Sequence, residues 1–432
     1  FGMNTVFMKR WMKNQVNQFD VIIVGGGAAG MMAAGTAAQN GLHTLLLEKN
    51  SRLGRKLRIT GKGRCNIVNN CDVPTAIAAI PSNGRFLYSA VSQFTPQDAI
   101  VFFENLGVPI KTERGNRVFP QSDLASDVVD ALKSYCTQNG VQIRQAVVTD
   151  LRIQEQTVTG VRCEDGTEYF SKHVVIACGG MSYPATGSTG DGYRLAQQAG
   201  HTITELRPSL VSLVANGKDC PALQGLSLKN VAIHVIDTKQ KKVIYDDFGE
   251  MMFTHYGVTG PMILSASSHM RNMEPNRYQI SIDLKPALSL EQLDTRLQKD
   301  FAENQNKDFI NSLGALLPRK LIPIMVAKSG IAPNQKCNQI TKEQRRRFAQ
   351  ELKGFKVMIK GFRPIDEAII TSGGVSVKEI SPKTMESKLV KGLYFAGEVI
   401  DADAYTGGFN LQIAFSTGYL AATAIAQAQW EI

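Results

Sequence analysis

A single stretch near the start of the chain, residues 19–48, most constrains its fold. It reads FDVIIVGGGAAGMMAAGTAAQNGLHTLLLE, which predicts an apolar strand, a glycine turn, a helix of small residues and a second strand. In this context Gly25 permits the tight turn, Gly27 lets the backbone approach a pyrophosphate, and Gly30 lets the helix pack closely on the strand. The helix N-terminus offers N–H groups to phosphates. Glu48 ends the second strand, where a carboxylate can bind ribose hydroxyls, so the segment predicts the dinucleotide-binding half of a Rossmann fold.

A second element of strand, glycines and helix lies near the other end of the chain. Residues 391–399 read KGLYFAGEV, a strand that closes on Gly397 and Glu398, and a glycine pair and a helix of small residues follow. Flavin enzymes with two dinucleotide folds carry a late strand of this kind, whose acidic end binds the ribityl chain of FAD. The Gly407-Gly408 step would let the backbone lie against a flat ring, and the helix N-terminus would stabilise negative charge on reduced flavin. An NAD dehydrogenase needs no late element of this kind, so the two elements together predict FAD.

Composition narrows the class of protein. The hydrophobic fraction of 43% is ordinary for a soluble globular chain, and the seven cysteines form no C-x-x-C pair. The six histidines show no metal-ligand spacing, so no metal site is expected. The long apolar stretch at 19–38 contains Asp20 and several glycines, so no membrane insertion is expected. The odd cysteine count and the lack of an evident signal peptide predict a cytoplasmic location, and residues 1–16 are interpreted as a leader or an expression remnant.

The net charge of +10 is uneven along the sequence. Between Arg319 and Arg363, twelve basic residues stand against two acidic ones, and a second basic cluster spans 52–64 without any acid. Such clusters attract anionic substrates, cofactor phosphates or nucleic acid, and a solvated basic face is the alternative for the first cluster. Nucleic acid is the less favoured partner but stays open, because no stacking motif accompanies the charge and aromatic residues make up only 7% of the chain.

Several further motifs accompany the two flavin elements in a fixed order. They are ITGKGRCNI at 59–67, RVFPQSDLASDVVDAL at 117–132, GGMSYPATGSTGDGY at 179–193, TSGGV at 371–375 and GLYFAGEVIDADAYTGGFNLQIAFSTG at 392–418. Together they resemble the BaiN/YhiN-like family of flavoproteins, also known as aminoacetone-oxidase-like, over nearly the whole chain from about residue 19. The resemblance implies an α/β fold: a discontinuous Rossmann-like FAD domain with an inserted β-barrel that itself carries a helical subdomain. It also implies an FAD-dependent, NAD(P)H-linked oxidoreductase, one named activity in the family being the reduction of unsaturated bile-acid intermediates.

The sequence changes character along the chain in a way that agrees with this organisation. Short β-like runs with polar turns fill 205–280, helical patterns follow, and KVMIKGF returns to strand. We expect the FAD domain over 17–204 and 365–432, the barrel over 205–283 and 354–364, and the helical subdomain over 284–353. Inserted domains often cover a cofactor cleft, so this middle part is expected to act as a lid, with the charge of 319–363 near the mouth of the cleft.

The motifs and the resemblance together assign residues to a site for non-covalently bound FAD. The AMP half is expected to lie against Gly25, Gly27, Ala28, Ala29, Gly30, Glu48 and Lys49. The pyrophosphate and the flavin are expected beside Arg55, Lys56, Thr60, Gly61, Gly63, Cys65 and Asn66. The site is expected to be completed by Gly179, Gly180, Gly397, Glu398, Thr406, Gly407, Gly408, Phe409 and Asn410.

The catalytic residue and the substrate are left open by the sequence. Tyr405, beside the expected flavin, and Cys65, a thiol in a basic loop that should deprotonate readily, are the two candidates, each with a plain packing role as the alternative. We expect an FAD-dependent oxidoreductase acting on a small or medium organic substrate, for which an anion would suit the charge, with NADH or NADPH as transient electron donor. The alternatives are a flavoprotein that modifies RNA, as tRNA-modifying flavoenzymes do, and a flavin-binding redox sensor without turnover.

Overall fold

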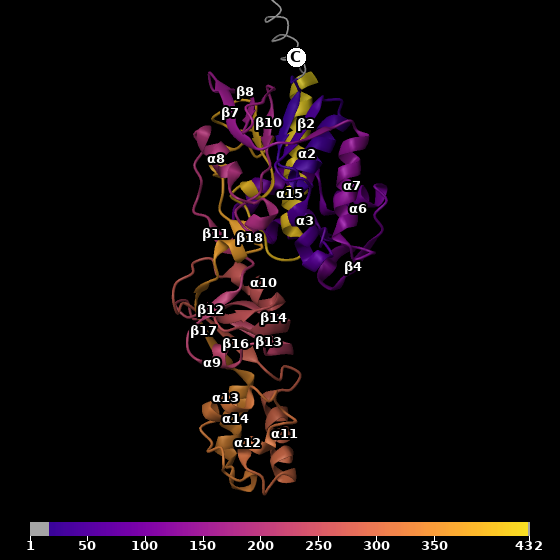
Figure 1. Cartoon of the computed structure of the whole chain (residues 1–432). Coiled ribbons are helices and arrows are strands. Elements are labelled where there is room, and N and C mark those ends of the chain that lie inside the picture. Colours follow the sequence, from indigo (N-terminus) through magenta and orange to yellow (C-terminus); the bar gives the residue numbers. More distant parts are fainter. Residues whose placement is uncertain (1–16, 431–432) are drawn as a thin grey trace, which may run out of the picture. The chain divides into compact units, whose positions relative to one another are not determined.

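The structure of the protein is a computed structural model that describes residues 17–430, and the expected leader at 1–16 lies outside this range. The chain divides into two compact units (Figure 1). Unit 1 combines the segment that ends at Pro208 with the segment that begins at Ala368, and unit 2 is the continuous segment Ser209–Glu367. Unit 2 is therefore an insertion into unit 1.

A five-stranded parallel sheet forms the centre of unit 1. Its strand order is β19 (Leu393–Phe395), β10 (Val174–Ile176), β1 (Val21–Val24), β2 (Thr44–Glu48) and β6 (Gln142–Gln145). Every residue of the three central strands is buried, as expected for a parallel sheet covered on both faces. The glycine turn after β1 and the loop after β19 leave the same edge of the sheet, because the carboxyl ends of parallel strands lie together. The two flavin elements predicted from the sequence thus meet although they lie far apart in the chain.

Helices of small residues pack directly on this sheet. The helix α2 (Ala28–Gln39) contacts both α15 (Phe409–Trp430) and α7 (Ala125–Gln138), and Figure 1 shows α2 and α15 side by side. A Cβ at Gly418 in α15 would overlap the carbonyl oxygen of Ala29, and a Cβ at Gly35 would overlap the ring of Tyr135. The backbones of α2 and α15 therefore approach more closely than larger side chains would allow.

Smaller elements complete unit 1. Two antiparallel sheets have the orders β3 (Val68–Asn69), β5 (Arg117–Pro120), β4 (Ile110–Glu113) and β7 (Val148–Gln154), β8 (Thr157–Cys163), β9 (Glu168–Phe170). The remaining α-helices are α3 (Arg55–Ile59), α4 (Val73–Ala78), α5 (Tyr88–Gln93), α6 (Pro96–Asn105) and α8 (Asp191–Gln198). A two-stranded sheet pairs β11 (Arg207–Ser209) with β18 (Ile370–Ser372).

Unit 2 combines a closed barrel with a group of helices. The barrel order is β12 (Leu213–Ala215), β15 (Gly257–Thr259), β14 (Lys242–Phe253), β13 (Ser227–Asp237), β16 (Tyr278–Asp283) and β17 (Phe355–Phe362). Two shorter helices, α9 (Asp219–Ala222) and α10 (Pro261–His269), accompany the barrel strands. The segment between β16 and β17 forms α11 (Leu290–Glu303), α12 (Phe309–Ser312), α13 (Ile322–Ser329) and α14 (Lys342–Lys353).

The barrel and these helices share one hydrophobic core, which includes Phe253 and Phe355 from the strands and Phe348 from α14. Capping boxes begin α11 at Ser289 and α14 at Thr341, where each N-cap hydroxyl accepts the backbone N–H of a glutamine three residues on. The structure thus confirms the predicted α/β fold with an inserted barrel that carries helices. No helix within residues 17–430 combines the length and the apolar character that crossing a bilayer requires.

Candidate FAD site

The glycine turn after β1 is set by backbone packing at two of its three glycines. Gly25 has a φ of +106°, which side chains rarely adopt, and a Cβ there would overlap the carbonyl oxygen of Ala177 at the end of β10. A Cβ at Gly30 would overlap the carbonyl oxygen of Gly25 itself. These two glycines hold the first turn of α2 against the sheet edge, as the motif predicts.

Gly27 differs from its two neighbours because nothing in the protein requires it. Its φ of −84° and ψ of −166° suit any residue, and a Cβ there would meet no heavy atom within 4 Å. Open space therefore lies at the N-terminus of α2, where Ala28 and Ala29 begin the helix and the first N–H groups have no intrahelical acceptor. A phosphate group placed in this space would meet helix N–H donors and the positive end of the helix dipole.

The carboxylate of Glu48 is fixed at the end of β2. It is buried, its Oε2 accepts the N–H of Gly26 at 2.7 Å, and its Oε1 accepts the backbone N–H and the side-chain amide of Asn50 at 2.8 and 2.7 Å. Three N–H donors orient it, while lone pairs remain for hydroxyl donors. The side chain of the neighbouring Lys49 instead pairs with Asp191 of α8 at 2.5 Å, and Arg55 donates to Asn50 at 2.9 Å.

Glu398, at the end of the late strand, meets Lys56 from the other end of the chain. The Lys56 Nζ lies 2.9 Å from Glu398 Oε2 and 2.9 Å from Ser182 Oγ, and Glu398 Oε1 accepts the N–H of Thr371 at 2.8 Å. Both charged side chains are about four-fifths buried. This pair joins α3, which follows β2, to the segment that follows β19.

Three of the other predicted glycines keep the surrounding loops close together. A Cβ at Gly180 would overlap the Thr371 hydroxyl oxygen, and a Cβ at Gly397 would lie 2.8 Å from the Cβ of Ala29. Gly179 has a φ of +73° and lies near the Ser188 hydroxyl. The late strand therefore packs directly on the first turn of α2.

The glycine pair in the loop before α15 also has a packing role within the protein. A Cβ at Gly408 would lie 2.7 Å from the Cα of Val68, so this glycine serves a close approach to β3. The carbonyl of Gly407 accepts the side-chain amide of Asn69 at 3.1 Å. Protein backbone already fills the Cβ side of Gly408, and the contact of the Gly407-Gly408 step with a flat ring stays a prediction.

Asn410 fixes the same loop from inside α15. Its Oδ1 accepts the N–H of Ala404 at 2.9 Å and its amide donates to the carbonyl of Ala404 at 2.8 Å. Between them, Tyr405 is half-buried and donates its N–H to the carbonyl of Ala79, and Thr406 is exposed. Phe409 begins α15 and is partly buried.

The loop over residues 60–66 supplies both a correction and an unexplained acceptor. The thiol of Cys65 is fully buried, and this burial raises its pKa to about 12, so the readily formed thiolate that we expected there is wrong. Asn66, next in the chain, has a buried side-chain Oδ1 with no hydrogen-bond partner within the described residues. Such an orphaned acceptor in a loop predicted to bind a cofactor suits an N–H donor on a ligand.

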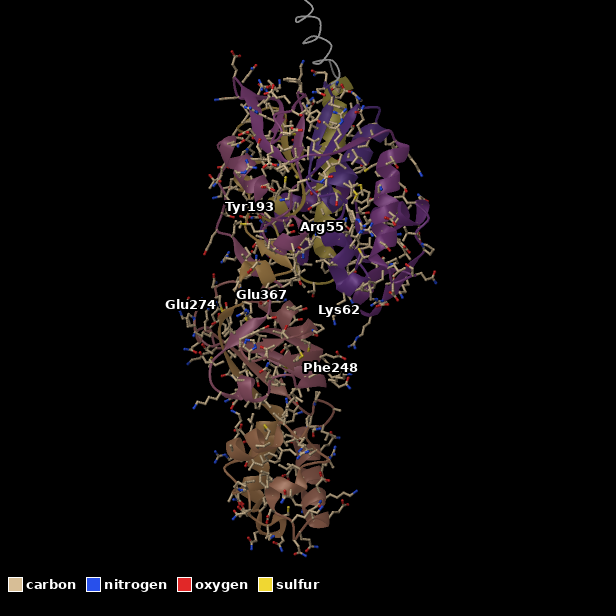
Figure 2. All side chains as sticks on the ribbon, in the orientation of Figure 1. Arg55, Lys62, Tyr193, Phe248, Glu274 and Glu367 are labelled. Carbon is tan, nitrogen blue, oxygen red and sulfur yellow. The ribbon has the colours of Figure 1, made fainter. Side chains whose placement is uncertain are left out.

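The middle of this loop has a left-handed backbone conformation. Gly61, Lys62 and Gly63 all have positive φ values, and Thr60 donates its hydroxyl to the carbonyl of Leu57 at 2.7 Å. Lys62 is exposed and projects from the ribbon of unit 1 (Figure 2).

Three polar residues near Glu398 were missed by the sequence reasoning. Ser182 and Thr371 both bond to the Glu398 carboxylate. Tyr193 of α8 (Figure 2) has a buried hydroxyl without a partner within residues 17–430, and burial followed by the charge of Glu398 raises its pKa. The motifs that contain Ser182, Tyr193 and Thr371 were noticed as strings, but only their glycines were assigned to the site.

The residues fit FAD on three observations of this structure: the open space at Gly27, the anchored Glu48 carboxylate, and the orphaned Asn66 acceptor. Fold and site together define a flavin-dependent oxidoreductase of the Rossmann type. The sequence profile described as "HI0933-like protein Rossmann domain" matches residues 19–424, so the chain belongs to this family, and the resemblance stated from the motifs is confirmed.

Two curated relatives align with nearly the whole chain. The chain is 30% identical over 412 residues to the 3-dehydro-bile acid delta(4,6)-reductase of Clostridium scindens, covering 94% of this chain and 98% of the relative. It is 31% identical over 409 residues to the ribosomal RNA dihydrouridine synthase of Escherichia coli, with the same two coverages. Among solved structures, a 3-ketosteroid-delta4-(5alpha)-dehydrogenase from Rhodococcus jostii RHA1 aligns with a TM-score of 0.51 and 14% identity over 94% of this chain and 97% of that chain, which shows the fold alone.

Proposed function

We propose that the protein is an FAD-dependent reductase that saturates a C=C bond conjugated to a carbonyl group, with NADH or NADPH as electron donor. The observation that carries this proposal is the near-equal likeness to two relatives whose named substrates look unrelated. A 3-dehydro bile acid with delta(4,6) unsaturation has its double bonds in conjugation with the 3-ketone. Uridine has its C5=C6 bond in conjugation with the C4 carbonyl. The reaction that both substrates allow, reduction of a C=C bond conjugated to a carbonyl, is therefore a better guide to the activity of this chain than either substrate name.

Such a reduction divides between the cofactor and the protein. Bound FAD, once reduced by NADH or NADPH, would supply the hydride equivalent for this reduction. The protein must stabilise the charge that develops on the carbonyl oxygen and deliver a proton to a carbon of the C=C bond. Tyr405 remains our candidate for the proton, since it lies half-buried in the loop held by Asn410. Cys65 is a weaker candidate, because a fully buried thiol lines no open part of the site.

The distribution of charge favours a uridine in ribosomal RNA over a small molecule as the substrate. Unit 2 carries 23 lysine and arginine residues against 16 aspartate and glutamate residues, which is +7 of the +10 on the whole chain. A bile acid carries a single negative charge and gains little from an excess of this size. An RNA gains from each phosphate that a cation neutralises. The RNA alternative, which we ranked below a small substrate from the sequence, is thus the one we now favour.

Reduction of a steroid-like dienone is the second candidate, and the likeness to the bile-acid reductase favours it. The test is one incubation with two substrates. The FAD-loaded protein and NADPH or NADH are mixed either with ribosomal RNA transcribed in vitro or with a 3-oxo-4,6-diene bile acid. Dihydrouridine is measured by mass spectrometry of RNA digests, and the dienone by the loss of its ultraviolet absorption.

We expect dihydrouridine in the RNA and little loss of dienone. Loss of the dienone without formation of dihydrouridine assigns the protein to steroid chemistry. If neither compound is reduced, the proposed reaction is refuted. A protein with Gly27→Val, which should not hold FAD, serves as the blank.

A further inference from the structure

We propose that unit 2 binds the phosphodiester backbone of RNA through one basic surface where the barrel meets the helices. This surface, called the basic strip below, consists of Lys218, Arg319, Lys320, Lys356 and Lys360. The proposal rests on the proposed function, because it names where the RNA substrate would be held. It adds what neither the relatives' names nor the FAD site gives, namely a surface in the inserted unit.

The first two members meet through the barrel ladder. Strands β12 and β17 are antiparallel, and the pairing continues past β12, since the N–H of Asn216 donates to the carbonyl of Met358 at 2.9 Å. Lys218 lies two residues beyond this bond and Lys356 two residues before it, so both lie at the same end of the ladder. On β17 the side chains of Lys356 and Lys360 are exposed while Val357 between them is buried. The two lysines therefore share the outer face of the barrel.

Helix α13 brings the other members to the same place. Lys320, just before α13, donates from Nζ to the carbonyl of Gln224 at 2.9 Å, which lies just after α9. At the other end of α13, the Nζ of Lys328 lies 2.8 Å from an oxygen of Asp219 and 5.1 Å from the ring centre of Phe355. Both ends of α13 are thus fastened to the segment that holds Lys218 and to the start of β17.

The strip carries little negative charge to offset its own. The segments 216–224, 318–330 and 355–362 contain six basic residues and a single acid, Asp219, which is already paired with Lys328. None of the five strip side chains forms an ion pair with any residue in 17–430. All five side chains are exposed. A dense, unpaired and accessible set of cations is what counterion release from a polyanion requires.

Five other basic residues of the run from Arg319 to Arg363, Lys328 included, have acidic partners instead, whereas Lys342, Arg346 and Arg347 of α14 are exposed and form no ion pair within residues 17–430. Arg345 of α14 donates two hydrogen bonds of 2.8 and 3.1 Å to the carboxylate of Asp294 in α11, and this pair joins the two helices. In the same way Lys336, Lys353 and Arg363 pair with Asp308, Asp283 and Glu367. The charge available for a partner is therefore smaller than the sequence count, and four of the seven unpaired cations of the run, Arg319, Lys320, Lys356 and Lys360, belong to the strip.

The test is a binding measurement that needs no turnover. A fluorescein-labelled oligouridine of about 20 nucleotides is titrated with the FAD-loaded full chain between 0.05 and about 0.3 M salt, and anisotropy gives the affinity at each salt. In the strip variant four residues are neutralised: Lys218→Gln, Arg319→Gln, Lys356→Gln and Lys360→Gln. A matched variant neutralises four exposed lysines elsewhere in unit 2 for which the structure shows no ion pair: Lys229→Gln, Lys241→Gln, Lys242→Gln and Lys307→Gln.

We expect the salt slope of the strip variant to be shallower by about 3, at roughly 0.7 for each lost contact with a single strand. That change corresponds to an affinity on the order of a hundredfold weaker at 0.1 M salt. The matched variant should lose less than about threefold, since the same net charge is removed from the protein but no phosphate contact is lost. A charge-preserving variant that exchanges lysine and arginine at the four strip positions should bind like the unmodified protein.

Three results overturn the inference: equal affinity losses in the strip and matched variants, no oligouridine binding by the unmodified protein at 0.05 M salt, or tighter binding to vesicles of anionic lipid than to RNA. Unchanged flavin absorbance and melting temperature in all variants show that they fold. A failure of the proposed function can be distinguished from a failure of this inference, because RNA would then still bind to the strip although no dihydrouridine forms. Conversely, a strip variant that binds RNA with unchanged affinity and still forms dihydrouridine would refute the proposed surface and support the proposed reaction.

Discussion

The substitution Gly27→Val separates the requirements of the fold from those of the cofactor. Gly27 has a backbone conformation open to any residue, and a side chain there would meet no protein atom within 4 Å. We expect the apo-protein to fold with a loss of about 1 kcal/mol, the order of an unfavourable helix N-cap. The isopropyl group would instead occupy the space at the helix N-terminus in which a pyrophosphate meets N–H donors.

The size of the effect follows from the donors that the phosphate would lose. A hydrogen bond to a charged group contributes about 1.5–3 kcal/mol, so losing two such bonds weakens FAD binding by about 3–6 kcal/mol. This corresponds to a dissociation constant that rises by about two to four decades. At FAD concentrations near 100 times the original constant, the unmodified protein gains about 2.7 kcal/mol of stability from the cofactor, or roughly 3–5 °C in melting temperature. The Gly27→Val variant should show no such gain.

The assay is a thermal melt of each apo-protein with and without FAD, together with an FAD titration followed by fluorescence. Gly314→Val is the matched control, because a side chain at Gly314 also meets open space but lies in unit 2. Gly30→Ala is the opposite control, because its Cβ would overlap the Gly25 carbonyl and should destabilise the apo-protein itself. An FAD affinity equal to that of the unmodified protein in Gly27→Val would refute the placement of the pyrophosphate.

Three further predictions concern single side chains. Asn66→Ala should leave the melting temperature of the apo-protein unchanged or slightly higher, because the buried Oδ1 has no partner to lose. In the same variant, an FAD titration should show at least a tenfold weaker affinity. A destabilised apo-protein with normal FAD affinity would contradict the assignment. Cys65 should resist iodoacetamide in the native protein at pH 8, because its pKa is near 12 and its thiol is buried, and peptide mass spectrometry would reveal any labelling. Burial, and then the charge of Arg271, lower the pKa of His269 from 6.5 to about 4, so the contribution of the neutral imidazole to the free energy of unfolding is complete above pH 6.5 and is lost as the pH falls towards 4. Urea unfolding should therefore show a loss of up to about 3 kcal/mol over this pH interval. A His269→Phe variant should show a shallower decline.

Much of the fold follows from local patterns in the sequence. The strand at 19–24, the helices near 124–139 and 341–353 and the strand of KVMIKGF lie within a few residues of β1, α7, α14 and β17 in the structure. These elements have clear apolar periodicity or clear stop signals, so their local preference and their final environment agree. The segment from 73 to 105 contains three helices, α4 to α6, that we did not predict because they are short and interrupted. These helices are stabilised by tertiary packing, since α5 and α6 contact α15 and α4 contacts α5.

The candidate site divides in the same way. Glycines in a strand–turn–helix context can be assigned from sequence, because their spacing carries the geometry. The pairing of Lys56 with Glu398 could not, because it joins residues 342 positions apart through tertiary structure alone. Cys65 shows the opposite error: a basic loop in the sequence suggested a thiolate, but the fold buries the thiol, and desolvation raises its pKa by more than the hydrogen bond with Thr60 lowers it. Arg345 shows the same limit for surface charge, since its partner Asp294 lies on a different helix.

The contact between α2 and α15 has a consequence for how the protein is made. Until the last segment of the chain has been synthesised, α2 lacks its contact with α15 and β10 lacks its neighbour β19. Unit 2 is continuous, so it leaves the ribosome whole while unit 1 still lacks Ala368–Ile432. At about 5–20 residues per second, the early half of unit 1 must persist for roughly 10–40 seconds with its small-residue helix face and a strand edge uncovered. A chain that terminates before α15 would therefore contain a complete barrel with its helices, and beside it a Rossmann half that has no counterpart to close on.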